Sequence, residues 1–161
     1  MNKTALDQYE EIVTDALSYC TAKLRKSFKS AFILVMILYM VIPRKINFTQ
    51  MGRYSDSCEQ RFRQLFEHDF DWLEFNTSLM WRGLGRVKRK AIAIDASFIS
   101  KAGKKTPYIG KFWSGCDSSV KRGLEILGIG IVDMDRHDCM MLRAEQTPDS
   151  DTLKSKGDGY N

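Results

Sequence analysis

The sequence has few of the residues from which zinc clusters and disulfide frameworks are built. Its 161 residues include four cysteines, Cys20, Cys58, Cys116 and Cys139, and two histidines, His68 and His137. No two cysteines have the spacing of a zinc knuckle, so a zinc site is not expected. Isolated cysteines are typical of a reducing compartment, which predicts a cytoplasmic protein.

The motifs of P-loop enzymes and serine hydrolases are also missing. The patterns GxxxxGK[ST], GxGxxG and GxSxG do not occur, so these chemistries are not supported. Residues 133–138, DMDRHD, resemble the start of a calcium-binding loop. However, Asp138 stands where that loop needs glycine and Ala144 where it needs glutamate. A hairpin turn is predicted here instead.

Long hydrophobic runs are absent as well. The longest, residues 31–42 (AFILVMILYMVI), is shorter than the roughly 20 residues that a membrane-spanning helix requires. The polar N-terminus has no apolar signal core, so no membrane or secretion element is predicted. The length of the run favours a buried helix, although its β-branched and aromatic residues leave a buried strand open.

Residues 1–85 are predicted to be helical. Thr4 and Asp7 form a capping box that would begin the first helix. Basic residues near its end, Lys23, Arg25 and Lys26, would complement the helix dipole. Ser30 is expected to cap the apolar helix, and Pro43 to end it.

Two short helices are predicted next, and they carry the first candidate DNA contacts. Asn47 would open one, and a capping box of Ser57 and Gln60 would open another that runs to about residue 68. A further helix is expected over residues 69–79. Two short helices joined by a tight turn resemble a helix-turn-helix, with Arg61 and Arg63 as candidate DNA contacts. A small helical bundle without DNA binding has the same pattern.

Residues 86–161 are predicted to form a second unit, because the apolar period there changes from helical to strand-like. Strands are expected over residues 91–99, 124–132 and 139–145, paired as an antiparallel meander. Residues 100–120 are expected to be a long connection, and a helix would begin near residue 151. The predicted fold class is therefore α+β.

Positive charge is concentrated at the start of this second unit, although the whole chain has a net charge of only +5. Between residues 82 and 122 there are eleven lysines and arginines but two acids, Asp95 and Asp117. Clustered cations are typical of a surface that binds a phosphate backbone, and a solvated loop is the alternative. The aromatic residues Tyr108, Phe112 and Trp113 lie among these cations. They could stack on unpaired bases, but burial of Phe112 and Trp113 against the sheet is the favoured prediction.

Asp95 is the candidate catalytic residue and metal ligand. It follows the apolar residues 91–94 and is interpreted as the end of a buried strand. A carboxylate at such a position can bind Mg²⁺, and pairs of these ions cleave phosphodiesters in many nucleic-acid enzymes. The alternative is a carboxylate that only ends a strand or caps a turn.

Four stretches of the chain resemble one family. They are NFTQMGRYSDSCEQRFRQLFEHDFDWLEFN, AIDASFISKAGKKTP, FWSGCDSSVKRGLEILGIGIVD and AEQTPDSDTLKSKG, which span residues 46–157. In this order they are similar to the N-terminal part of bacterial insertion-sequence transposases of the aspartate–aspartate–glutamate (DDE) class. The resemblance implies a helical DNA-binding region followed by the first strands of a ribonuclease H-like domain.

The resemblance also implies a site and partners. Asp95 matches the first catalytic carboxylate, which would bind Mg²⁺. Asp149, Asp151 and Asp158 lie too early to be the second aspartate, so an incomplete, truncated catalytic domain is expected. From the clustered positive charge, and not from the resemblance, phosphate contacts are assigned to Lys101, Lys104, Lys105, Lys121 and Arg122.

The intact family cleaves and transfers strands at transposon ends, so double-stranded DNA is the expected partner. A homo-oligomer or an association with intact transposase is also expected, at a nucleoid-associated, cytoplasmic location. Two alternatives stay open. One is a catalytically inactive DNA-binding remnant that interferes with intact transposase, and the other is an unrelated α+β interaction protein.

Overall fold

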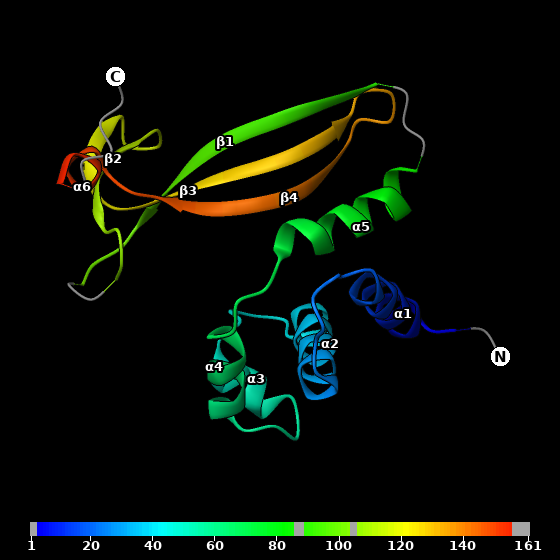
Figure 1. The fold of residues 1–161 in the computed structure, drawn as a ribbon. Coiled ribbons are helices and arrows are strands. Elements are labelled where there is room, and N and C mark those ends of the chain that lie inside the picture. Colours follow the sequence, from blue (N-terminus) through cyan, green and yellow to red (C-terminus); the bar gives the residue numbers. More distant parts are fainter. Residues whose placement is uncertain (1–2, 86–88, 104–105, 156–161) are drawn as a thin grey trace. The chain divides into compact units, whose positions relative to one another are not determined.

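The computed structural model describes residues 3–85, 89–103 and 106–155 (Figure 1). The chain forms two compact units, Met1–Gly83 and Leu84–Asn161, called here the helical unit and the sheet unit. The helices of the first are α1 (Ala5–Ser18), α2 (Lys26–Val41), α3 (Phe48–Arg53), α4 (Glu59–Phe66) and α5 (Trp72–Leu84). The second contains β1 (Lys90–Ser100), β2 (Gly110–Ser114), β3 (Ser119–Asp133), β4 (Asp138–Thr147) and α6 (Ser150–Ser155). The fold class is α+β.

The predicted capping box of α1 is confirmed. The Asp7 amide donates to Thr4 Oγ1 over 3.2 Å, and the Thr4 amide donates to Asp7 Oδ2 over 2.8 Å. The hydrogen bonds from the Thr4 hydroxyl and amide hold the pKa of Asp7 below its ordinary value, because they favour the ionised carboxylate. Two of the free amides at the helix start are thereby satisfied.

The long apolar run forms a helix, α2, as its length predicted, but the predicted cap at Ser30 is wrong. The helix begins earlier, with Arg25 at the N-cap position and no side-chain cap. Ser30 lies inside the helix, where its hydroxyl donates to the Lys26 carbonyl over 3.1 Å. The helix ends at Val41, two residues before Pro43. Because α1 ends at Ser18, Lys23 lies in the connection between the two helices, Arg25 is the N-cap of α2, and Lys26 is the first residue of α2.

Helix α2 contributes to both hydrophobic clusters of the helical unit. One cluster joins Phe32 of α2 to Val13, Ala16 and Leu17 of α1 and Phe75 of α5. The other joins Val35, Leu38 and Ile42 to Met51 of α3 and Phe62 of α4. The low amphipathicity of the α2 sequence follows from this arrangement, since neighbours cover more than one side of the helix.

Helices α3 and α4 form largely as predicted. Asn47 caps α3, since its Oδ1 accepts from the Gln50 amide over 2.9 Å. The capping box of Ser57 and Gln60 is wrong, because Cys58 occupies the N-cap of α4 and makes no side-chain cap. Helix α4 also ends at Phe66, and α5 begins at Trp72 rather than at residue 69.

All described strands of the sheet pair with β3. Strand β1 runs antiparallel to β3 along residues 123–133. Strand β2 pairs with residues 119–123 and β4 with residues 125–133, so these two follow one another along the other edge of β3. The three expected strands and their antiparallel pairing are confirmed. Strand β2 was missed, because it lies within the residues predicted to be one long connection.

Gly123 marks the point on β3 where the neighbouring strand changes from β2 to β4. It pairs with Ser100 on one edge and Gly110 on the other. A methyl group in its place would meet the Ile99 carbonyl oxygen at 2.3 Å and the Phe98 ring at 2.5 Å. Only glycine fits here without a shift of β1.

The prediction that β1 is a buried strand is wrong. Ile92 and Ile94 are 71% and 64% exposed. They lie on the same face of the sheet as Ile129 and Ile131 of β3, their register partners. Among the described strand residues, Phe112 is the buried apolar side chain. The apolar pattern of β1 therefore reflects an open sheet face and not a core.

We predict that Leu38→Ala lowers the free energy of unfolding of the helical unit by about 2–5 kcal/mol, because it leaves a cavity beneath α2. Leu38 is 1% exposed, whereas Met40 on the same helix is 61% exposed. The matched control, Met40→Ala, should change stability by less than about 0.5 kcal/mol. Urea unfolding followed by far-ultraviolet circular dichroism measures both, and equal losses would contradict the central position of α2.

Candidate nucleic-acid interface

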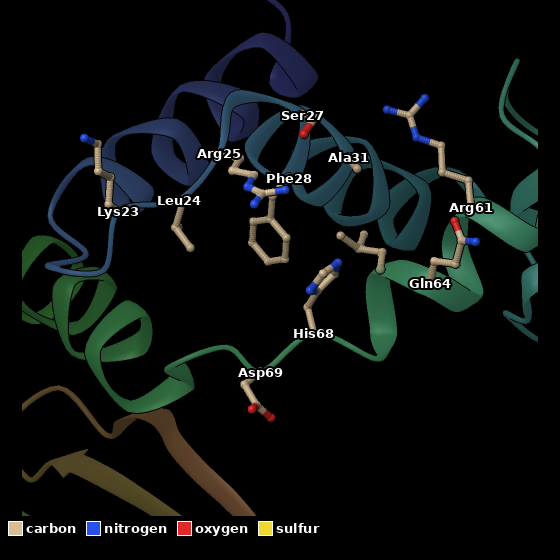
Figure 2. A pocket seen from close by; sticks show the side chains of 11 residues that line it. Lys23, Leu24, Arg25, Ser27, Phe28, Ala31, Arg61, Gln64, His68 and Asp69 are labelled. Atoms are coloured by element: carbon tan, nitrogen blue, oxygen red, sulfur yellow. The ribbon is translucent and has the colours of Figure 1, made fainter.

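A cleft of about 510 Å³ opens between the start of α2 and the end of α4 (Figure 2). Four basic side chains line it: Lys23, Arg25, Arg61 and His68. They come from segments far apart in the sequence. Of these residues, only Arg61 was predicted as a DNA contact.

Aromatic packing supports the wall of this cleft. The Phe28 ring meets the His68 ring edge-on, with 6.0 Å between centroids, and stacks on Phe70 at 5.8 Å. Phe28 and Phe70 also pack against the cluster of α1, α2 and α5. These contacts hold His68 beside the first turn of α2.

The charge of the cleft is positive and largely uncompensated. Within the described residues, neither Lys23 nor Arg25 forms an ion pair, and Arg61 makes one weak contact, a 3.5 Å hydrogen bond to the Ser57 hydroxyl. Asp69 also lines the cleft, but its carboxylate points away from the Phe28 and His68 rings in Figure 2. The first turn of α2 contains no acidic residue, so its free amides add positive potential.

The two arginines predicted on α4 have different surroundings. Arg63 pairs with Glu59 one turn earlier, with 3.0 Å between Nε and Oε1, and its guanidinium lies 5.0 Å from the centre of the Phe48 ring. The hydrogen bond from Arg63 lowers the pKa of Glu59. Arg63 thus already has a carboxylate and an aromatic partner, whereas Arg61 faces the cleft.

Asp95 lies in the middle of β1, so its predicted place at the end of a strand is wrong. The strand continues to Ser100 because residues 96–100 keep pairing with β3. The Asp95 side chain is exposed. It stands opposite Gly128 of β3, beyond which Ala144 of β4 follows in register. Small residues therefore surround the carboxylate and leave it open to solvent.

The described residues do not assemble a Mg²⁺ site around Asp95. No group of three or more histidine, cysteine, aspartate and glutamate side chains that could hold a metal occurs among them. Asp149 accepts from the Thr152 amide over 3.0 Å at the start of α6, and its pKa is lowered, chiefly by the Thr152 hydroxyl. Asp158 lies outside the described residues. Enzymes that use a pair of Mg²⁺ ions usually bind them with more than one carboxylate.

The three described phosphate contacts predicted in the sheet unit, Lys101, Lys121 and Arg122, have different surroundings. Lys101 is exposed just after β1. Lys121 pairs with Asp117, with 2.7 Å between Nζ and Oδ1. Arg122 reaches the Gly103 carbonyl at 3.5 Å, and Lys104 and Lys105 lie outside the described residues.

The two aromatic residues of β2 point to opposite faces. Phe112 is buried, as predicted. The predicted burial of Trp113 is wrong, since its side chain is 61% exposed. Strand alternation explains the difference, because neighbouring side chains of a strand lie on opposite faces.

Comparison with family models, curated proteins and solved structures gave no match. The similarity to transposases therefore rests on the sequence motifs alone. In the part of the chain that the structure describes, no helix combines the length and apolarity needed to cross a bilayer.

We predict that the chain alone, incubated with Mg²⁺ and supercoiled plasmid, produces no nicks above background, because the described residues bring one carboxylate to the sheet face. Agarose gel electrophoresis measures the product. Nicking that disappears in Asp95→Ala would contradict this prediction and would show that further ligands reach Asp95. Because Asp95 is exposed, that variant should melt like the wild type.

Proposed function

We propose that this chain is a DNA-binding protein of the transposase type, whose helical unit holds the duplex of a transposon end. The observation that carries the proposal is the cleft between α2 and α4, whose lining has three cations, Lys23, Arg25 and Arg61, against one carboxylate, Asp69. Unpaired cations that face one cleft repel one another, and a phosphate group relieves that repulsion. The DNA backbone is the phosphate-bearing partner that the sequence resemblance implies.

The arrangement of the short helices supports the same proposal. Helices α3 and α4 are joined by a short connection and packed against α2 through Met51 and Phe62. This resembles a helix-turn-helix, in which one helix crosses the DNA backbone and the next enters the major groove. Arg61 on α4 would then contact a phosphate at the edge of that groove.

A second candidate function is Mg²⁺-dependent strand cleavage and transfer, in association with intact transposase. The exposure of Asp95 on β1 favours it, together with the outer edge of β1, which pairs with no described strand. A ribonuclease H-like domain would use that edge for a further strand. The described residues contribute one carboxylate to such a site and carry no catalytic step by themselves.

We predict that duplex DNA binding falls steeply with salt and depends on Arg61 more than on Arg63. Each phosphate contact contributes a slope of about −0.9 to a plot of log affinity against log salt concentration. Arg25→Ala/Arg61→Ala should therefore reduce the magnitude of the slope by roughly 2. Filter binding with a 30-base-pair duplex measures it.

Arg63→Ala is the matched control on the same helix, because the Arg63 side chain is already paired with Glu59. It should change the slope by less than Arg61→Ala does. Little binding at any salt concentration would favour the unrelated interaction protein over the DNA-binding protein. If Arg61→Ala and Arg63→Ala change the salt slope equally, the cleft is not the site that binds DNA.

A further inference from the structure

Strands β2 and β3 form a hairpin with two chemically different faces. Burial alternates along β2, with Gly110, Phe112 and Ser114 buried and Lys111 and Trp113 exposed. The register pairs Lys111 with Arg122 and Trp113 with Val120. These four side chains therefore share one face of the hairpin, called here the Trp113 face.

The apolar part of the Trp113 face is exposed rather than buried. Trp113 and Val120 are 61% and 60% exposed, although they lie directly opposite each other. A cross-strand pair of this kind stabilises a hairpin by roughly 0.2–1 kcal/mol. At 61% exposure, much of the indole surface of Trp113 is accessible.

The charged part of the face places two cations opposite each other. Like charges at directly paired positions of two strands are destabilising. Within the described residues, neither Lys111 nor Arg122 forms an ion pair with a carboxylate. Lys121, on the opposite face of β3, does pair with Asp117, whose pKa is lowered first by its hydrogen bond to Lys121. Within the hairpin, Lys111 and Arg122 thus lack the side-chain ion pair that Lys121 has, although the Asp149 carboxylate accepts from the Lys111 backbone amide.

We propose that the Trp113 face binds single-stranded DNA, with an unpaired base stacked on Trp113 and the flanking phosphates held by Lys111 and Arg122. Proteins that bind single strands without sequence preference combine aromatic platforms with cations that follow the backbone. Side chains two residues apart on β2 are separated by about 6.7 Å, which suits a base and its neighbouring phosphate. The inference involves other residues than the duplex-binding cleft and does not depend on it.

A fluorescein-labelled oligothymidylate of 20 nucleotides tests the proposal by fluorescence anisotropy with the full-length chain. Trp113→Leu keeps an apolar partner for Val120 but removes the aromatic surface, and should weaken binding on the order of tenfold. Trp113→Phe should restore most of the affinity. Trp81→Leu, which changes an exposed tryptophan of α5, should bind like the wild type.

The neighbouring cations give a second, independent comparison. Arg122→Ala should weaken oligothymidylate binding several-fold, whereas Lys121→Ala, on the opposite face of the same strand, should have little effect. Thermal melting of each variant identifies a loss that is caused by unfolding. If Trp113→Leu is unfolded, the comparison of Arg122→Ala with Lys121→Ala still decides.

Three results would overturn the proposal. The first is wild-type affinity for oligothymidylate in a folded Trp113→Leu variant. The second is an equal loss of affinity in Arg122→Ala and Lys121→Ala. The third is self-association that depends on Trp113 in sedimentation experiments, while Trp113→Leu leaves oligothymidylate binding unchanged. In the Arg25→Ala/Arg61→Ala background, Trp113→Leu should still weaken oligothymidylate binding on the order of tenfold. A failure of the duplex-binding proposal would therefore appear separately from a failure of this one.

Discussion

Both units are organised by one apolar segment that is too long for a single neighbour to cover. In the helical unit this segment is α2, which shares one cluster with α1 and α5 and another with α3 and α4. In the sheet unit it is β3, which pairs with β1 along one edge and with β2 and β4 in succession along the other. Burial of α2 and hydrogen bonding of β3 fix the positions of the other elements, and the candidate sites lie on the elements so placed.

The distribution of paired and unpaired charge follows from this arrangement. Arg63, Arg82 and Lys121 each have a carboxylate within their own unit. Exposed ion pairs of this kind add little stability, but they remove these cations from the set available to an anionic partner. Among the described cations for which no ion pair is found, Lys23, Arg25 and Arg61 line the α2–α4 cleft, and Lys111 and Arg122 lie on the Trp113 face.

The sequence predicted those features that local interactions determine. The capping box of Thr4 and Asp7 and the cap at Asn47 depend on residues three positions apart, and both are present. The caps at Ser30 and Ser57 failed because tertiary burial of the apolar run and of Phe62 places the helix starts elsewhere. Strand β2 was missed because it is short and lies among glycine, serine and lysine residues that favour turns.

The candidate sites were harder to predict because they depend on distant residues. Arg61 was predicted as a DNA contact, but Lys23 and His68 line the same cleft only through the packing of α2 against α4. Asp95 was predicted at the end of a strand, but it lies in the middle of β1. The pattern of apolar residues does not show where the pairing of β1 with β3 stops. If β2 had been predicted, the alternation of side chains along a strand would have placed Phe112 and Trp113 on opposite faces of the sheet.

Gly123 limits how the sheet can change by substitution. A Cβ at this position would clash with the backbone of β1, so close pairing of β3 with both β1 and β2 at this point requires glycine. A larger residue would have to displace β1 at the same point at which β2 gives way to β4 along the other edge of β3.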